Sequence, residues 1–376
     1  MTADASPLFS PHTLGPLELP HRLLMAPMTR CRASLPGEVP NGLMATYYRQ
    51  RAGAGLIFTE ATHVSPGGLG YVAMPGVYSD AQRDGWRLVT DAVHDAGGRI
   101  FAQLYHAGRV THPELLPDGL GPVAPSPIAL EETEAHTPTG KHPIPAPHEL
   151  TGDEVSAIVE DFRHAAQVAK DAGFDGVQLH GANGYLIDEF LRDGTNRRTD
   201  GFGGDIARRL TFPLEVVAAL LDVWEPGRVG VRVSPTGTFN EMTDSDPLTH
   251  FTEVFKAIDA TGVGHLEVVG QLFDQPEPHP QQAEIDRSAR EHFGRTLIFN
   301  GNYDKATAEA ALSAGRCDLI TMGRPFLANP DLPTRLRLDA ELNEITDPTT
   351  LYNPAAGPTG YTDYPAMQER PIASSP

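Results

Sequence analysis

Eight short apolar runs alternate along this chain with stretches of helical spacing, and this alternation constrains the fold more than any other feature. The runs lie at 23–26, 56–61, 99–104, 176–179, 229–233, 265–269, 296–299 and 318–322. Strands that alternate with helices are typical of parallel sheets. A doubly wound open sheet would give the same alternation, but usually with fewer units in 376 residues. The pattern therefore predicts an α/β fold, a (β/α)8 TIM barrel, with residues 1–376 as one domain.

Caps and apolar spacing place the helices between these runs. Thr151 and Glu154 have the spacing of a capping box ahead of an apolar series with helical period. Pro213 lies inside another helical pattern, where it disfavours a continuous helix. The expected helices cover 43–52, 79–97, 151–173, 205–223, 249–261, 282–293, 304–314 and 331–340.

Two segments fall outside the repeat. Residues 8–21 carry short apolar pieces broken by prolines and Gly15, which predicts a small β-hairpin lid ahead of the first barrel strand. Residues 106–150 form one long stretch crowded with Pro and Gly. Loops of that length inside compact domains are usually functional, so we expect this one to lie over the barrel mouth.

The overall charge excludes several classes of partner. Lys and Arg number 29 against 49 Asp and Glu, and the net charge of −20 argues against nucleic acid and against an anionic membrane surface.

Cys31 and Cys317 are the only cysteines, so neither a disulfide framework nor a Cys-rich metal site is expected, and we predict no metal. The chain has no apolar run of 18 residues and no signal-peptide pattern, which favours a cytoplasmic protein.

The sequence His180-Gly-Ala-Asn183-Gly-Tyr185 gathers polar groups between the fourth apolar run and the next helical pattern. It offers imidazole and amide donors and a phenol whose ordinary pKa near 10 keeps it protonated at neutral pH. Such a set suits holding a carbonyl oxygen and delivering one proton beside it. The alternative is an ordinary strand-to-helix loop with a capping Asn and a packed Tyr.

Other polar residues follow the apolar runs and would share the same end of a barrel, where active sites of this fold lie. Each has a structural alternative: Gln103 could be a core amide, and Arg232 could form a buried ion pair with Glu60 or Glu267. Besides the 180–185 stretch, the set comprises Thr29, Glu60, Gln103, Arg232, Asn302 and Arg324.

The connections after the last two runs indicate a phosphate site. Gly301 and Asn302 follow the seventh run, and Gly323 and Arg324 follow the eighth. These two loops form the recurrent phosphate site of such barrels, in which glycines admit the ligand and an arginine pairs with its charge. No G-x-G-x-x-G follows the first run, so a dinucleotide-binding fold is not supported.

Several longer matches give the chain a family resemblance. It resembles the old yellow enzyme family of FMN-dependent ene-reductases, and most closely its bacterial enone- and nitroester-reducing members. The matching stretches are 23–30, 58–61, 103–109, 180–204, 229–235, 322–332 and 360–365.

The resemblance implies a role for each matching residue. Pro27, Thr29, Ala61, Gln103 and Arg232 would surround the isoalloxazine and ribityl chain, and Gly301, Asn302, Gly323 and Arg324 would hold the FMN phosphate. His180 and Asn183 would bind the substrate's carbonyl oxygen, Tyr185 would donate the proton, and Tyr71, Tyr105 and Tyr352 would line the pocket. Position 105 is a departure, because many relatives carry Trp there.

The implied reaction has two steps. NADPH or NADH reduces FMN, and the reduced flavin passes hydride to the β-carbon of an α,β-unsaturated carbonyl or nitroalkene while Tyr185 protonates the α-carbon. The protein would act on small molecules as a monomer or small homo-oligomer. Two rival hypotheses are a flavin-free, phosphate-handling barrel lyase or isomerase with His180 and Tyr185 as its acid–base pair, and a flavin-containing binding protein without turnover.

Overall fold

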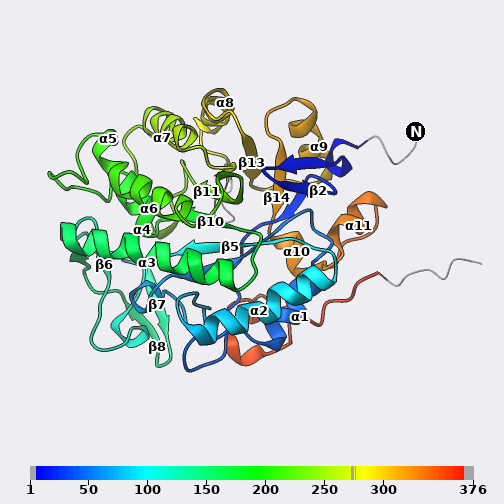
Figure 1. The fold of residues 1–376 in the computed structure, drawn as a ribbon, viewed down its shortest axis with the longest axis horizontal. Helices are drawn as coiled ribbons and strands as arrows, with labels where there is room; N and C mark the ends of the chain where they lie inside the picture. Colours follow the sequence, from blue (N-terminus) through cyan, green and yellow to red (C-terminus); the bar gives the residue numbers. More distant parts are fainter. Residues whose placement is uncertain (1–5, 272–274, 276, 368–376) are drawn as a thin grey trace, which may run out of the picture.

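Eight parallel strands close into a barrel in the computed structural model, which describes residues 6–271, 275 and 277–367 (Figure 1). Around the barrel the order is β10-β11-β12-β13-β14-β3-β4-β5, so the first and last strands of the barrel pair with each other. The (β/α)8 fold predicted from the alternation is confirmed. The strands are β3 (Leu23–Met25), β4 (Ile57–His63), β5 (Ile100–Tyr105), β10 (Gly176–Gly181), β11 (Val229–Val233), β12 (His265–Val269), β13 (Thr296–Asn300) and β14 (Leu319–Met322).

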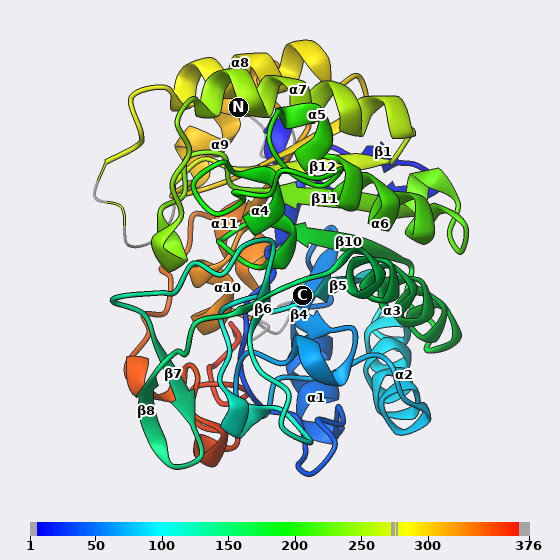
Figure 2. The same cartoon turned by 90° about the vertical axis from the view of Figure 1, so that its left-hand side faces the viewer.

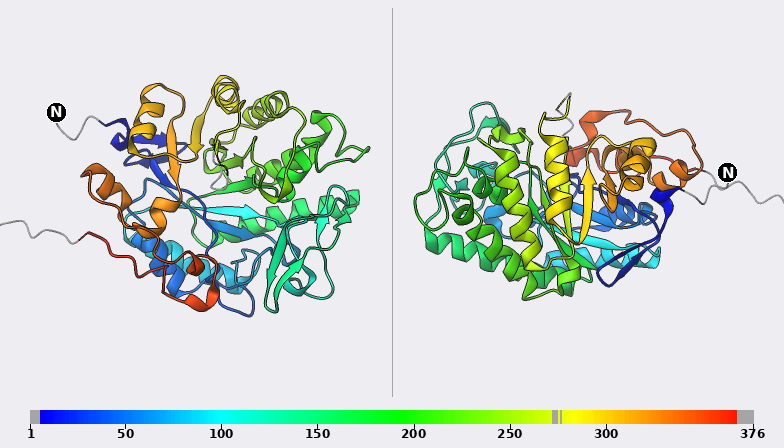
Figure 3. Two further views of the ribbon diagram at one scale, coloured as in Figure 1. Left: turned by 180° about the vertical axis from the view of Figure 1, so that it is seen from behind. Right: turned by 90° about the horizontal axis from the view of Figure 1, so that it is seen from above.

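Helices surround the strands as an outer ring (Figures 1 and 3). Among the residues that the structure describes, none of these helices has the length and apolar character that crossing a bilayer requires. The expected capping box forms at Thr151–Glu154, and a second one, not predicted, forms at Ser79–Gln82. The helices are α1 (Gly42–Gln50), α2 (Asp80–Asp95), α3 (Gly152–Asp171), α4 (Leu186–Leu191), α5 (Ile206–Arg209), α6 (Thr211–Leu221), α7 (Pro247–Thr261), α8 (Gln282–His292), α9 (Lys305–Ser313), α10 (Arg324–Ala328) and α11 (Leu332–Arg337).

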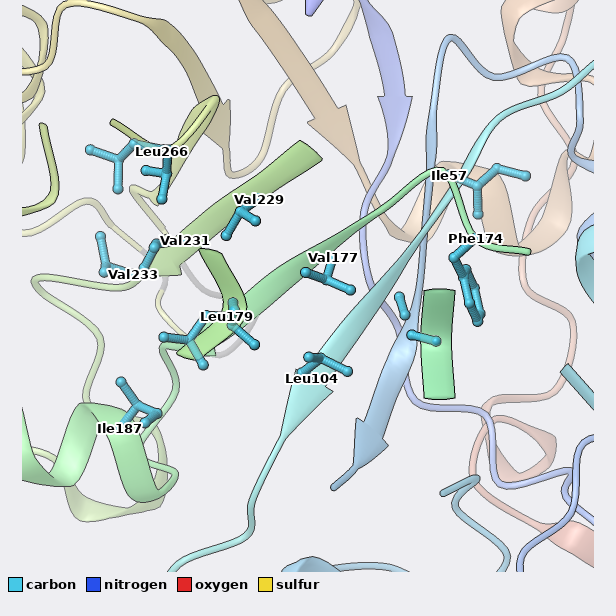
Figure 4. Close-up of a cluster of buried hydrophobic side chains, with 14 of the residues drawn as sticks. Ile57, Leu104, Phe174, Val177, Leu179, Ile187, Val229, Val231, Val233 and Leu266 are labelled. Carbon is cyan, nitrogen blue, oxygen red and sulfur yellow. The ribbon is translucent and has the colours of Figure 1, made fainter. Parts of the chain in front are cut away.

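Alternate residues of each strand face opposite sides of the barrel wall. The outward set on β10 and β11 includes Val177, Leu179, Val229 and Val231, which join the large buried cluster between strands and helices (Figure 4). Burying one such side chain contributes about 1.5–3 kcal/mol. Because side chains alternate with a period of two, Gln178, His180 and Arg232 are left to point into the barrel.

A hairpin forms where residues 8–21 were expected to give one, from β1 (His12–Leu14) and β2 (Leu17–Leu19). It does not lie over the mouth. Its leucines pack against Leu24 and Phe58 inside the barrel, and Gly15 lies so close to Gly227 that an added Cβ would stand 2.4 Å from its carbonyl oxygen. Residue 227 precedes β11, so the hairpin closes the N-terminal end of the barrel. The hairpin is therefore not the expected lid. It plugs the N-terminal end of the barrel, which we call the floor.

The stretch 106–150 has more regular structure than its composition suggested. It contains β6 (Val123–Ala124) paired with β9 (His148–Glu149), and β7 (Glu134–Thr137) paired with β8 (Gly140–Pro143). The β7–β8 hairpin stands away from the barrel (Figure 2). Residues between these strands pack with Tyr105 and Tyr185 in a second buried cluster, which places the stretch beside the C-terminal ends of the barrel strands.

The predicted helix at 205–223 is two helices, α5 and α6, which meet at Leu210. Pro213 falls in the first turn of α6. A backbone N–H in that turn has no partner within the helix, so a residue without one is tolerated there.

Candidate active site

The strand registers bring the candidate residues to one end of the barrel. His180 on β10 stands opposite Arg232 on β11, which stands opposite Glu267 on β12. Gln103 on β5 is opposite Ala61 on β4 and Gln178 on β10. These positions lie near the C-terminal ends of parallel strands, where the active sites of this fold are built.

Four aromatic rings form a cluster at this end. The hydroxyls of Tyr71 and Tyr185 lie 2.9 Å apart, within hydrogen-bond distance. The ring centre of Tyr185 lies 4.6 Å from that of Tyr105 and 5.2 Å from that of His180, both with edge-to-face geometry. Edge-to-face contacts between rings add about 0.5–1.5 kcal/mol each to the burial energy. The cluster therefore holds the Tyr185 hydroxyl and the His180 imidazole beside each other.

His180 is a neutral hydrogen-bond donor. Its Nδ1 accepts from the backbone N–H of Ala182 at 3.3 Å, so the ring proton is on Nε2. Burial, reinforced by the positive charge of Arg232, lowers the pKa of His180 well below its usual value. No hydrogen bond among the described residues uses Nε2, which leaves this N–H available to an oxygen atom of a ligand.

Tyr185 keeps its proton. Burial raises the pKa of its hydroxyl to about 12, although contacts with Tyr71 and Asn240 oppose that rise. The residue is the N-cap of α4, so the first turn of the helix fixes its backbone. A protonated phenol that is 7% exposed is a possible general acid for a ligand in the mouth.

Asn183 lies in a tight turn that aims its side chain. Its φ is 61°, that of Gly184 is 74°, and a Cβ on Gly184 would stand 2.6 Å from Met242 Cγ. The Asn183 N–H donates to Ser234 Oγ at 2.8 Å, and its carbonyl accepts from Asn240 Nδ2 at 2.8 Å. Its side-chain Oδ1 is buried without a partner among the described residues. Buried polar atoms usually have a hydrogen-bond partner, and a bound ligand can supply one here.

Below these groups lies a polar layer inside the barrel. Gln103 Nε2 donates to Gln178 Oε1, and Gln178 Nε2 donates to Glu267 Oε2, each at 2.8 Å. Arg232 Nη2 donates to Asn300 Oδ1 at 3.1 Å, and Arg232 Nε lies 3.3 Å from Glu267 Oε2. Gln103 is thus a bonded interior amide, and Arg232 pairs with Glu267.

Glu60, the other candidate partner of Arg232, has a different set of contacts. Its carboxylate accepts from the backbone N–H groups of Arg30 and Cys31 and from the Tyr48 hydroxyl. These bonds fix the segment that follows β3, in which Pro27 and Thr29 lie half-buried. Glu60 therefore positions the loop after the first barrel strand and does not face the mouth.

The ring of Tyr105 faces the site, whereas its hydroxyl is covered. Its ring points to the same side as Gln103 and packs 5.7 Å from the His180 ring, as the period of two predicts. Its hydroxyl, however, is buried without a hydrogen-bond partner among the described residues. A Cβ on Gly70 would stand 2.4 Å from this oxygen, so the loop after β4 covers it. The phenol oxygen does not reach water.

Tyr352 lies on a C-terminal segment that two arginines hold. Arg30 Nε donates to the carbonyl of Leu351 at 3.2 Å, and its Nη2 donates to the carbonyl of Gly360 at 2.6 Å. Arg32 Nη2 donates to the carbonyl of Thr350 at 2.7 Å. Tyr352 itself is 58% exposed. It is therefore an exposed ring on an anchored backbone.

The four predicted phosphate ligands follow β13 and β14. Gly301 and Gly323 are half-buried, and Asn302 and Arg324 are exposed. A Cβ on Gly323 would stand 3.3 Å from Met28 Sδ, so a side chain here would fill space between the first and last strands of the barrel. Gly323 is the N-cap of α10, in which Pro325 has no N–H and the Phe326 N–H donates to the Gly323 carbonyl at 2.9 Å.

Three residues near the site were not predicted from the sequence: Gln178, Ser234 and Asn240. Gln178 was overlooked because it lies within an apolar run, although a polar residue at an inward position of a buried strand is itself a signal. Ser234 directly follows β11. Asn240 lies in an irregular turn with φ of 58°, which the sequence does not indicate.

The chain has clear relatives among known proteins. The model of the NADH:flavin oxidoreductase / NADH oxidase family matches residues 7–343. The chain belongs to this family. A probable flavin mononucleotide-dependent alkene reductase of Leishmania infantum is 38% identical over 364 residues, covering 96% of this chain and 97% of that protein.

Two solved structures share the fold over nearly the full length. Morphinone reductase in complex with tetrahydroNAD has a TM-score of 0.90 and 46% identity, covering 96% of this chain and 99% of that one. The old yellow enzyme homologue from Zymomonas mobilis has a TM-score of 0.89 and 40% identity, covering 96% and 99%. This protein is accordingly an FMN-dependent ene-reductase of the old yellow enzyme type that uses NADPH or NADH. The resemblance seen in the sequence is confirmed, and the flavin-free lyase or isomerase is not favoured.

The groups at the mouth fit FMN. Glycines leave room at the ends of β13 and β14, where the positive charge of Arg324 suits a dianion. The interior layer supplies an amide and a guanidinium at the height of the strand ends. The unpartnered Asn183 Oδ1 leaves a polar atom for a further ligand.

Proposed function

We propose that the enzyme reduces the carbon–carbon double bond of α,β-unsaturated carbonyls and nitroalkenes, with Tyr185 as the proton donor to the α-carbon. The observation that carries this assignment is the Tyr185 hydroxyl, protonated and held 2.9 Å from the Tyr71 hydroxyl in the aromatic cluster. As the proton leaves Tyr185, the Tyr71 hydroxyl can donate to the phenolate oxygen and stabilise it.

His180 and Asn183 hold the carbonyl or nitro oxygen of the substrate in this proposal. His180 presents the Nε2 proton, because its Nδ1 is bonded to the backbone of Ala182. No hydrogen bond among the described residues uses the side-chain Nδ2 of Asn183. Two neutral donors to one oxygen would favour the enolate-like charge that develops there, and a neutral imidazole does so without giving up its proton.

The cofactor is held along the strand ends. Pro27, Thr29, Ala61, Gln103 and Arg232 surround the ring system and ribityl chain, and Gly301, Asn302, Gly323 and Arg324 bind the phosphate. When bound, FMN supplies the hydride for the substrate's β-carbon. Tyr71, Tyr105 and Tyr352 line the pocket above it; of these, Tyr352 is the exposed ring that a ligand can cover.

Anaerobic titration tests the proposal. Purified protein should show the yellow absorbance of bound flavin, bleach on addition of NADPH or NADH, and recover its colour on addition of 2-cyclohexenone or a nitroalkene. A protein that bleaches but recovers colour only with oxygen would be a flavin-containing binding protein without this activity. A colourless protein that cannot be loaded with FMN would contradict the proposal as a whole.

The setting of the enzyme is proposed from composition. Residues 1–376 form one barrel domain that works in the cytoplasm on small molecules, as a monomer or small homo-oligomer and without nucleic acid. The support is a net charge of −20, which repels polyanions, and two cysteines that are both buried and free, as suits a reducing compartment.

A further inference from the structure

One carboxylate lies beneath the mouth, in the centre of the barrel. Glu267 on β12 is fully buried. Its Oε1 accepts from the Thr321 hydroxyl at 2.7 Å, and its Oε2 accepts from Gln178 Nε2 at 2.8 Å. Its Oε2 also lies 3.3 Å from Arg232 Nε. The two carboxyl oxygens thus accept from two neutral donors and lie beside a guanidinium, contacts that suit a carboxylate.

These contacts determine which way the side-chain amide of Gln103 is turned. A carboxylate can only accept, so the Gln178 group that faces Glu267 is the NH2. The Gln178 carbonyl must then face Gln103, whose own NH2 donates to it at 2.8 Å. No hydrogen bond among the described residues uses the Gln103 side-chain carbonyl oxygen. The charge on Glu267 thus sets the orientation of the Gln103 amide through the Gln178 amide that lies between them.

The same carboxylate compensates the charge of Arg232. Within the described part of the chain, Glu267 is the single acidic residue with an oxygen within 4.0 Å of that guanidinium. The nearby histidines add no positive charge, because burial lowers the pKa of both His180 and His265. The strand-end groups therefore carry a nearly neutral pair, where an unpaired arginine would present a full positive charge.

We propose that Glu267 tunes the bound flavin: by compensating Arg232 and orienting Gln103 it disfavours negative charge on the ring and so lowers its reduction potential. This inference rests on the proposed function, in which Arg232 and Gln103 contact the isoalloxazine. Glu267 acts through those two side chains and is a positioning residue. A purely structural role would instead leave the potential unchanged and lower only stability.

Glu267→Gln tests the inference, since it removes the charge and keeps the shape. The FMN-loaded variant is compared with wild type in two measurements that need no turnover: the midpoint potential against a reference dye, and the dissociation constant for sulfite. Sulfite adds to oxidised flavin and brings negative charge with it. We expect sulfite to bind about tenfold more tightly and the potential to rise by about 30 mV, which is tenfold for a two-electron couple.

Thr321→Val is the matched control, because it removes a neutral hydrogen bond to the same carboxylate and leaves the charge in place. Its sulfite affinity should stay within about twofold of wild type. If Glu267→Gln does not fold, Glu267→Met removes the same charge without an unpaired amide and must shift sulfite binding in the same direction. A yellow Glu267 variant with wild-type potential and sulfite affinity would overturn the inference alone. A wild type that binds no FMN would instead overturn the proposed function.

Discussion

The two ends of the barrel are built from the same eight strands but differ in their interior: one end is filled with apolar side chains, and the other carries polar groups. At the floor, Leu14, Leu24, Phe58 and Phe101 fill the interior, and the Phe58 and Phe101 rings meet edge to face at 6.0 Å. At the mouth, Asn183 Oδ1 is buried with no hydrogen-bond partner among the described residues.

The difference separates stability from chemistry along one axis. Floor residues complete their contacts within the protein, so changing them should alter the free energy of unfolding. Mouth residues keep donors and acceptors for a ligand, so changing them should alter rate and binding. The polar layer of Gln103, Gln178, Glu267 and Arg232 lies between the two and belongs to both.

Tyr185→Phe should give the largest effect and act on one half-reaction only. Proton delivery supplies about 10²–10⁴-fold, so reoxidation of the reduced flavin by an enone should slow by that order. Reduction by nicotinamide should stay near the wild-type rate, since no proton from Tyr185 is needed there. Stopped-flow absorbance measures both steps. Unchanged enone reoxidation would remove Tyr185 from the mechanism.

Phe58→Ala is the corresponding test at the floor. The side chain is fully buried against Phe101 and His265, so truncation should cost about 3–5 kcal/mol of unfolding free energy. Rate constants of the folded, FMN-loaded fraction should change little. Urea denaturation gives the unfolding free energy, and stopped flow on a separate portion of the same preparation gives the rate constants. A slowed enone step with unchanged stability would break the division between the two ends.

His180→Ala should weaken substrate binding and hydride transfer together. Loss of a strong oxyanion donor costs about 2–4 kcal/mol. Phenols mimic the enolate, and the variant should bind them more weakly and lose the long-wavelength charge-transfer band of the flavin complex. Asn183→Ala should act in the same direction. Wild-type phenol affinity with the band retained would refute this assignment.

His265 gives a pH dependence that arises from the interior. Burial lowers its pKa from 6.5 to about 3. Below pH 6.5 the unfolded chain therefore takes up a proton that the folded protein does not. As the pH is lowered through this range, His265 reduces the free energy of unfolding by about 1.4 kcal/mol per pH unit. In urea denaturation at pH 7.5 and 5.5, the unfolding free energy of His265→Phe should decrease less between the two pH values than that of the wild type. His136→Gln, at an exposed position, is the control and should show the same decrease as the wild type.

The smallest effects are expected at Tyr105. Its hydroxyl has no partner among the described residues, so Tyr105→Phe should change stability by less than about 1 kcal/mol and leave selectivity unaltered. Tyr105→Trp needs more room beside Gly70 and should narrow the acceptance of β-bulky cyclic enones. Rates and product enantiomers on small and bulky enones measure this. Identical selectivity in wild type and Tyr105→Trp would show that this position does not shape the pocket.

The sequence predicted the barrel well because its strands are apolar on the outward side and short enough to stand out. It predicted β4 as 56–61, whereas the strand continues to His63. Polar residues such as Thr62 obscured that end, yet they are buried by the loops that cover it. The break at Leu210 followed from Pro213, whereas β7 and β8 are held by pairing within a Pro- and Gly-rich stretch that carries little propensity signal.

The candidate site could be anticipated residue by residue, but its internal bonding could not. The sequence left Arg232 to pair with either Glu60 or Glu267. The choice depends on the strand register and on which face each strand turns inward, and a single sequence fixes neither. The covering of the Tyr105 hydroxyl by Gly70 likewise joins the end of β5 to the loop after β4, and only the folded chain determines their approach.

The bonds of Arg30 and Arg32 have a consequence for synthesis of the chain. Their guanidinium groups, 1% and 3% exposed, donate to carbonyls 318 to 330 residues further along. While the ribosome is still translating, these charges are present and their acceptors are not. The segment that supplies these acceptors also carries Tyr352. A nascent chain therefore completes these bonds only after all eight barrel strands have been synthesised, and a chain cut between β14 and Thr350 would carry every barrel strand but leave both guanidinium groups without these acceptors.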